Sequence, residues 1–369
     1  MHKATIRILA ALLGAFASVQ VAGATFVYVS NAEDGDIGMY TLRSDGSLQP
    51  GSRFKAGPMV MPMSVSPDKR FLVAASRAKP FSAHTYSIDR ATGALKSVGS
   101  GPLAESFPYI TFDRTGRHLL SASYGAHLVS VNPVNPDGTV GAPAQVIPTA
   151  RNAHAIITDK TNRFAFVPHL GTDQVFQFQF DEKSGRLSAN TPPVLQLKAG
   201  TGPRHLITSP DNRFVYLLNE LTATVSTLAL ENGLLKEVSS ASALPPESKL
   251  GPGMPRPQQG RDVSNDIWAS DLHVTPDGRF LYAAERTSSS IGSFSVEPST
   301  GTLRYLGSTP TEKQPRGFRI DPTGHFMVVS GEKSDTLSSY RIEPNGLLVP
   351  VGRVATGKGS NWVEIVSFD

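Results

Sequence analysis

Arginine, histidine and carboxylate side chains that flank short apolar segments are the residues of this chain best suited to chemistry. In residues 202–220, Arg204 and His205 lie just before an apolar run, and Asn219 and Glu220 end a second one. A carboxylate can accept a proton from water, and guanidinium groups can hold an anion or a developing oxyanion. This stretch therefore predicts acid–base chemistry on an anionic substrate.

The polar turn inside this stretch recurs along the chain with the strand that follows it. Phe or His opens each copy of that strand, at positions 26, 71, 118, 164, 214, 280 and 326. The spacing is 45–50 residues except for one interval of 66 residues. A period of this length is typical of propeller blades.

A second hairpin with a glycine turn follows each copy, at Gly46, Gly93, Gly138, Gly185, Gly233, Gly301 and Gly346. Four strands in each of seven repeats predict an all-β, seven-bladed β-propeller with four-stranded blades. The tail 361–368 matches the first strand of a blade, so it should pair with the strand at Phe26. That pairing would close the ring and cover both sheet edges.

Repeat phase predicts one off-centre pocket, because it brings charged residues of blades four to seven to one end of the channel. Glu220 or His154 would accept the proton from water, and Arg204, Arg286 or Arg316 would hold an oxyanion or a substrate anion. The alternative is that these are structural ion pairs around the channel rim. The pocket consists of His154, Arg204, His205, Glu220, Asp271, Glu285, Arg286 and Arg316, with Asn219 beside Glu220.

The remaining patterns limit the possible chemistry. The chain has no Cys, which excludes disulfides and thiol nucleophiles. Asp271 and His273 could be read as a metal pair, but strand residues two apart share one buried side, so no metal is expected. A phosphate-binding glycine loop is also missing, so no cofactor is expected. The arginines of the repeated turns, such as Arg70 and Arg213, are expected to be structural.

The N-terminus has the pattern of a secretory signal peptide over residues 1–24. Lys3 and Arg7 precede an apolar run at residues 8–21, and Ala22-Gly23-Ala24 provides a small-residue cleavage site. An uncleaved anchor is the alternative. Residues 25–369 would then form one periplasmic or secreted propeller without a membrane span, expected to be a monomer. The net charge of +4 falls to about +2 without Lys3 and Arg7, so nucleic acid is not an expected partner.

One connection is much longer than the others and explains the interval of 66 residues. It covers about residues 242–268 and is rich in Pro and Gly, which excludes a regular strand. It enters just before the innermost strand of the sixth blade. Long connections in compact repeats are usually functional or disordered, so this insertion is expected to affect access to the pocket.

The chain resembles the lactonase family of seven-bladed propellers, which includes propeller-type 6-phosphogluconolactonase and the fungal carboxy-muconate lactonizing enzyme. The resemblance extends over nearly all of residues 25–369, and its most specific segments are residues 202–205, 219–221, 268–279, 285–287 and 314–318. By motif, it implies a catalytic group of His154, Arg204, Glu220 and Arg286. It also implies ring-opening hydrolysis of a lactone ester, or the related cyclisation.

Three functions follow as hypotheses. The first is a lactonase that hydrolyses a sugar lactone, with His205, Asn219, Asp271, Glu285 and Arg316 binding an anionic lactone or sugar acid. The second is a carboxy-muconate-type lactonizing cycloisomerase that uses the same pocket. The third is a non-catalytic exported propeller that binds a ligand or a protein on the same face.

Overall fold

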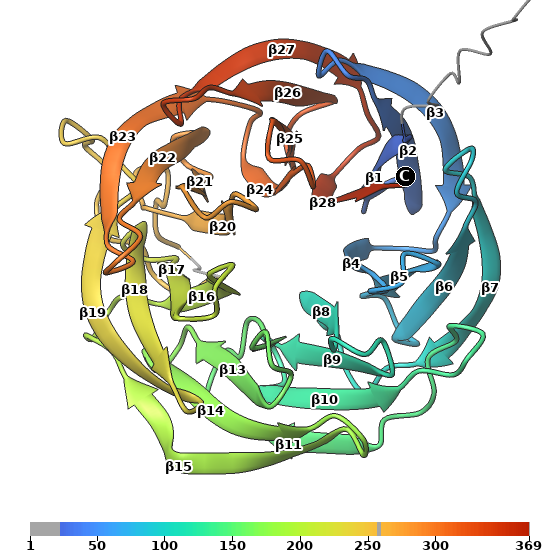
Figure 1. Cartoon of the computed structure of the whole chain (residues 1–369), viewed down its shortest axis with the longest axis horizontal. Helices are drawn as coiled ribbons and strands as arrows, with labels where there is room; N and C mark the ends of the chain where they lie inside the picture. The colour runs from blue at the N-terminus through green and yellow to red at the C-terminus, as the bar shows by residue number, and fades with distance from the viewer. Residues whose placement is uncertain (1–22, 257–259, 369) are drawn as a thin grey trace, which may run out of the picture.

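The chain folds into a closed ring of seven four-stranded antiparallel sheets around a central channel (Figure 1). The computed structural model describes residues 23–256 and 260–368, and within these ranges it contains strands and turns but no helix. The predicted seven-bladed propeller is therefore confirmed. Most of the predicted signal segment, residues 1–24, lies outside the described residues.

Each blade begins with its innermost strand and ends with its outermost strand. Blade 1 contains β28 (Ser360–Ser367), β1 (Thr25–Asn31), β2 (Asp36–Leu42) and β3 (Leu48–Lys55); blade 2 contains β4 (Val60–Val65), β5 (Phe71–Ser76), β6 (Ser82–Ile88) and β7 (Leu95–Pro102); blade 3 contains β8 (Tyr109–Phe112), β9 (His118–Ser123), β10 (Leu128–Pro133) and β11 (Gln145–Pro148); blade 4 contains β12 (Ile157–Thr158), β13 (Phe164–His169), β14 (Gln174–Asp181) and β15 (Arg186–Gln196).

The last three blades follow the same order. Blade 5 contains β16 (Pro203–Thr208), β17 (Phe214–Asn219), β18 (Thr224–Glu231) and β19 (Leu234–Ser242); blade 6 contains β20 (Ala269–Val274), β21 (Phe280–Glu285), β22 (Ser290–Val296) and β23 (Leu303–Pro310); blade 7 contains β24 (Pro315–Ile320), β25 (Phe326–Gly331), β26 (Thr336–Ile342) and β27 (Leu348–Ala355).

The core is divided into seven apolar clusters, each between two neighbouring blades. Alternate residues of one strand serve different clusters. Tyr28 packs towards blade 2, whereas Val27 and Val29 pack towards blade 7. Because strand residues alternate between the two faces of a sheet, both faces of each blade are buried, which explains the continuous apolar runs in the sequence.

Two repeated sequence features meet at the blade interfaces. The aromatic ring that opens the second strand of one blade covers the hairpin glycine of the next blade, as Phe164 covers Gly233. A Cβ built on Gly233 would lie 2.0 Å from Cδ1 of Phe164, and the φ of Gly233 is +77°. Glycine is therefore required there both by backbone conformation and by space.

The repeated polar turns have a structural role, and their arginines make internal contacts as expected. Asp211 accepts a hydrogen bond from Nε of Arg213 at 2.6 Å, and the guanidinium of Arg213 lies over the ring of Phe214. The fourth turn residue has a positive φ in all six turns: Lys69, Gly116, Asn162, Asn212, Gly278 and Gly324. Asn and Gly tolerate this conformation well, which explains why they occur there so often.

The C-terminal strand closes the ring as predicted. β28 pairs with β1 in antiparallel register from Ser367 opposite Thr25 to Ser360 opposite Asn31. The backbone N–H of Phe368 also donates to the carbonyl of Ala24 at 2.9 Å. The first and last strands of the chain thus cover each other's edges.

Candidate active site

Five of the seven innermost strands begin with a bulge, where a residue stands outside the pairing ladder. In β16, Pro203 pairs with Asn219 and His205 with Leu218, so Arg204 is an additional residue without a partner in the ladder. Similar irregularities occur at the starts of β4, β20 and β24 and in the pairing of β28 with β1. Bulges are known to redirect side chains next to active sites, and here the bulge supplies Arg204.

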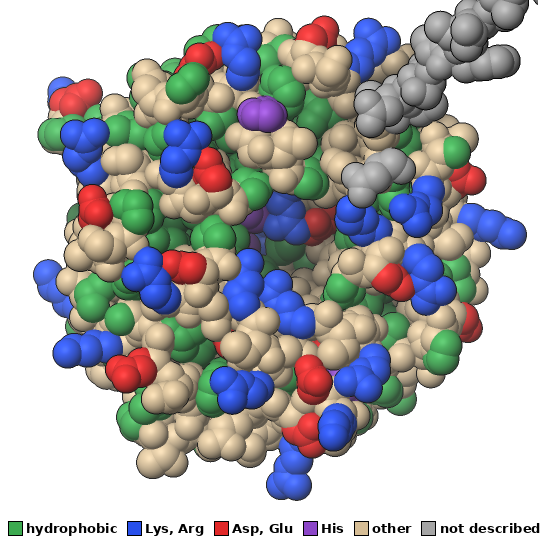
Figure 2. Space-filling model, viewed as in Figure 1, with side chains coloured by type: hydrophobic (Ala, Val, Ile, Leu, Met, Phe, Trp, Pro, Cys, Tyr) green, Lys and Arg blue, Asp and Glu red, His purple; other side chains and the backbone are tan. Residues whose placement is uncertain are grey.

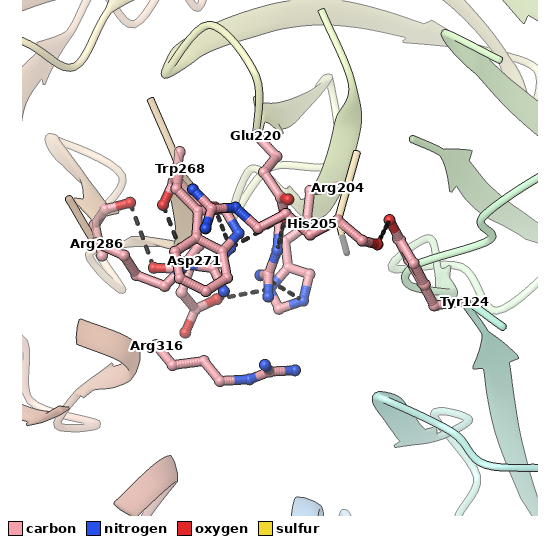
Figure 3. A network of polar contacts seen from close by, with 12 residues as sticks. Tyr124, Arg204, His205, Glu220, Trp268, Asp271, Arg286 and Arg316 are labelled. Atoms are coloured by element: carbon pink, nitrogen blue, oxygen red, sulfur yellow. Dashed lines mark hydrogen bonds and ion pairs between the residues drawn. The ribbon is translucent and has the colours of Figure 1, made fainter. Parts of the chain in front are cut away.

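Glu220 lies between two buried guanidinium groups at this end of the channel (Figure 3). Its Oε2 accepts from Nε of Arg204 at 2.7 Å and from Nη2 of Arg286 at 3.1 Å. Its Oε1 has no hydrogen bond to any of the described residues. Arg204, Glu220 and Arg286 form what we call the cluster. It therefore combines an available carboxylate oxygen with a net positive charge.

Arg286 is held in place by backbone and aromatic contacts. It donates to the carbonyl of Trp268 at 3.1 Å and to that of Ala269 at 3.0 Å. Its guanidinium lies 3.6 Å from the centre of the Trp268 ring. These contacts fix the group before any substrate is present.

His205 and Asp271 form a second layer behind Arg204. Because a guanidinium only donates, Nε2 of His205 accepts from Nη1 of Arg204 at 3.0 Å, and Nδ1–H then donates to Oδ1 of Asp271 at 2.9 Å. Asp271 also accepts from the backbone N–H of Leu272 and from Nε2 of His273. These contacts orient Arg204, and the substrate contact expected of His205 and Asp271 stays a prediction.

Burial controls the charge of the histidines in this region. Desolvation, followed by the charge of Arg204, lowers the pKa of His205 to about 3. The same two causes hold the pKa of His154 well below its ordinary value. The His154 ring packs edge-on against Tyr124 and His205, and its buried Nδ1 has no hydrogen bond within the described part of the chain. Both imidazoles are therefore neutral at neutral pH.

Asn219 and Glu285 occupy the same repeat position. Their side chains make different contacts from those of the residues that follow them. Glu285 accepts from the backbone N–H groups of Trp268 and Ser288, both at 2.6 Å. Asn219 donates to the hydroxyls of Thr224 and Ser226. These contacts shape the adjacent turns, and the substrate contacts expected of both residues stay a prediction. The next residue in each blade, Glu220 or Arg286, belongs to the cluster.

Arg316 extends beside the cluster, with Nη1 at 3.3 Å from Oε1 of Glu332 (Figure 3). Sequence reasoning placed Arg316 in the pocket but left out three residues at this end of the channel. Arg77, Tyr124 and Glu332 occupy the same repeat position as Glu220, so the repeat alignment contained the signal for them.

The insertion lies at this end of the channel. It connects β19 with β20, and its described residues form no strand. The hydroxyl of Tyr124 donates to the carbonyl of Arg256 at 2.8 Å, linking blade 3 to the insertion. The guanidinium of Arg256 lies 4.0 Å from the centre of the Trp268 ring. The insertion is thereby joined to the two aromatic residues that border the cluster.

A cavity of about 440 Å³ lies in the half of the channel away from the cluster of Arg204, Glu220 and Arg286. Figure 2 shows a hollow at the centre of the disc with basic side chains along its edge. Tyr109, His205, Asp271 and Trp362 line the cavity, whereas Arg204, Glu220 and Arg286 do not. The rings of Tyr109, His205 and Trp362 contact one another at the cavity, and His205 also bonds to Arg204 of the cluster.

We expect the free energy of unfolding of the His205→Gln variant to fall less steeply with decreasing pH than that of the wild type. The unfolded imidazole has a pKa of about 6.5 and the folded one about 3, so only the unfolded chain gains a proton as pH falls between these values. This linkage lowers the free energy of unfolding by up to about 1.4 kcal/mol per pH unit, and His205→Gln removes it. Urea unfolding between pH 6 and pH 4 measures the slope.

The matched control for this measurement is His325→Gln, because His325 is exposed on a turn. The control should keep the wild-type slope. An unchanged slope in His205→Gln would contradict the neutral, buried state of His205.

The fold and this cluster define a seven-bladed propeller with a polar site at one end of its channel. The chain belongs to the lactonase family of seven-bladed propellers: the family model described as "Lactonase, 7-bladed beta-propeller" matches residues 23–365. The resemblance seen in the sequence is thus confirmed. Over the described ranges, the chain forms no helix with the length and apolar character needed to cross a bilayer.

Similar proteins cover nearly the whole chain. A 6-phosphogluconolactonase of Erwinia tasmaniensis is 37% identical over 344 residues, which are 93% of this chain and 99% of that protein. A 6-phosphogluconolactonase of Cronobacter sakazakii is 37% identical over 93% of this chain and 98% of its own length. The structure of the periplasmic gluconolactonase of Pseudomonas aeruginosa aligns with a TM-score of 0.82 and 26% identity, covering 94% of this chain and 99% of that one.

Proposed function

We propose that this chain is an exported lactonase that opens the ester ring of a sugar lactone with water. The observation that carries the proposal is Oε1 of Glu220, an available carboxylate oxygen on a residue held between Arg204 and Arg286. The names of the relatives, 6-phosphogluconolactonase and gluconolactonase, support the same chemistry.

In the proposed reaction, Glu220 takes a proton from water while the water oxygen attacks the lactone carbonyl carbon. Arg204 and Arg286 stabilise the negative charge that develops on the carbonyl oxygen. The bond between that carbon and the ring oxygen then breaks, and the proton returns from Glu220 to the ring oxygen. The product is a hydroxy acid, which loses its acidic proton to solvent. His154, as a neutral imidazole beside Arg204, is the second candidate for the proton acceptor.

A panel of lactones tests this function. Purified protein is incubated with gluconolactone, 6-phosphogluconolactone and carboxy-muconate, and acid release or ring formation is followed. The expected result is hydrolysis of sugar lactones without turnover of carboxy-muconate. Turnover of carboxy-muconate alone would favour the lactonizing cycloisomerase. Binding of sugar acids without any turnover would favour the non-catalytic propeller.

We also propose that the protein is periplasmic or secreted. The pattern of residues 1–24 supports export, and so does the name of the Pseudomonas aeruginosa relative. Cell fractionation and N-terminal sequencing test this, with Thr25 as the expected first residue of the exported chain. Recovery of the full-length chain from the cytoplasm alone would contradict export.

A further inference from the structure

We propose that Arg77 binds a negatively charged substituent of the substrate, a phosphate ester or a second carboxylate, across the channel from Glu220. The inference rests on the proposed lactonase function and deepens it by naming the substrate class. Nothing in the lactone-opening steps described above requires Arg77.

The repeat places Arg77 at the same end of the channel as the Glu220 cluster. Arg77 follows β5 in blade 2 as Glu220 follows β17 in blade 5. Its Nε donates to Oγ of Ser106 at 2.9 Å, and Nη1 lies 3.1 Å from Sδ of Met61. Neutral neighbours on both sides therefore hold the guanidinium in place.

The charge balance distinguishes Arg77 from the other arginines at this end. Arg204 and Arg286 share Glu220, and Arg316 pairs with Glu332. Arg77 forms no ion pair with any of the described residues. Burial lowers the pKa of Arg77 to about 10, so the group is still charged at neutral pH. Glu332, whose negative charge acts on Arg77, already pairs with Arg316, so the partly buried Arg77 is short of negative charge and an anionic ligand would supply it.

Arg316 connects the two sides of the site. Its charge acts on Arg77 and also on Arg204 and His154. Because charges influence one another strongly only at short range, Arg316 lies near both the reactive cluster and Arg77. A substrate with its ester carbonyl at Glu220 and an anionic end at Arg77 would pass beside Arg316.

The chemistry of the ligand follows from the charges at this end of the channel, where Glu220 and Glu332 are already paired with other arginines. An unphosphorylated, neutral sugar lactone offers only hydroxyl groups to Arg77. A phosphate ester or a carboxylate can accept two parallel hydrogen bonds from a guanidinium, which is among the strongest polar contacts in proteins. The site therefore favours an acidic lactone over a neutral one.

Steady-state kinetics tests the proposal with gluconolactone, 6-phosphogluconolactone and a carboxylated lactone, glucarolactone. In Arg77→Met, the preference in kcat/KM for the acidic lactones over gluconolactone is expected to fall by about 10- to 100-fold, mainly through KM. Arg77→Lys should recover part of it, because a point charge remains. Comparing the two acidic lactones distinguishes phosphate from carboxylate recognition.

Arg70→Met is the matched control, because Arg70 is an exposed turn arginine paired with Asp68. It should keep the wild-type preference. Equal losses for gluconolactone and the acidic lactones in Arg77→Met, or a loss in kcat alone, would overturn the proposal, since both would point to a role in the chemical step or in folding. Thermal unfolding of each variant checks the fold.

Calorimetric titration with 6-phosphogluconate and gluconate separates this inference from the proposed function. If no lactone is opened but 6-phosphogluconate binds through Arg77, the lactonase function fails and the anion site stands. If lactones are opened while 6-phosphogluconate binds no more tightly than gluconate, and glucarolactone shows no advantage over gluconolactone, the anion site fails and the lactonase function stands.

Discussion

Replacement of Glu220 by Gln is expected to lower kcat for lactone hydrolysis by about 10³-fold, within the range for loss of a general base. Gln keeps the size and the hydrogen-bonding oxygen of the side chain but cannot accept a proton from water. Substrate affinity should change less than kcat, because the arginines remain in place. Single-turnover and steady-state measurements with the preferred lactone give both quantities.

Glu343→Gln is the control for this experiment, because Glu343 is a carboxylate paired with an exposed arginine, Arg341, away from the cluster. It should behave as wild type. Wild-type kcat in a folded Glu220→Gln protein would remove Glu220 as the proton acceptor and leave His154 as the candidate.

Arg204→Met is expected to destabilise the fold by about 3–5 kcal/mol, the range for breaking a buried ion pair from one side. The Arg204 side chain is 1% exposed and that of Glu220 is 5% exposed, so solvent cannot compensate the carboxylate. Arg286 still bonds to Glu220, which makes the lower end of this range the better expectation. Urea unfolding at pH 7 measures the change.

A double-mutant cycle with Glu220→Gln identifies the origin of this loss. If the unpaired carboxylate causes it, the double variant should be more stable than the sum of the two single changes predicts. Strict additivity, or an Arg204→Met protein within 1 kcal/mol of wild type, would contradict the structural importance of this pair.

The fold could be predicted from the sequence because its markers recur in every blade. Phe164 and Gly233 stood out separately as a strand start and a hairpin turn, and the structure shows that they contact each other across a blade interface. Contacts that repeat with the blade leave a periodic signal in the sequence. The closing strand was predictable for the same reason, since its pattern matches the first strand of a blade.

The site was predictable only to the level of repeat position. The repeat alignment identified Asn219 and Glu220 as one pair of candidates. Because successive residues point in different directions, Asn219 bonds to nearby hydroxyls and Glu220 bonds to the two arginines. His205 and Asp271 illustrate a second limit, because their contact joins residues that are 66 positions apart in different blades. Such partners depend on blade packing, which one sequence without aligned relatives does not show.

Arg77 was passed over for a related reason. Its residue type and repeat position are visible in the sequence, yet its importance comes from the lack of a carboxylate partner among the described residues. The sequence offers many carboxylates, and only the folded arrangement shows that none of the described ones pairs with Arg77.

The position of β28 also affects when the fold can be completed. Blade 1 has only three strands until residues 360–367 are available, and β1 keeps an open edge until then. During synthesis, six blades can assemble while the ring stays open at the first blade. A chain that is exported before its last strand is made would therefore cross the membrane without having formed the closed ring. Ring closure thus depends on residues 360–367, which are made after every other strand of the ring.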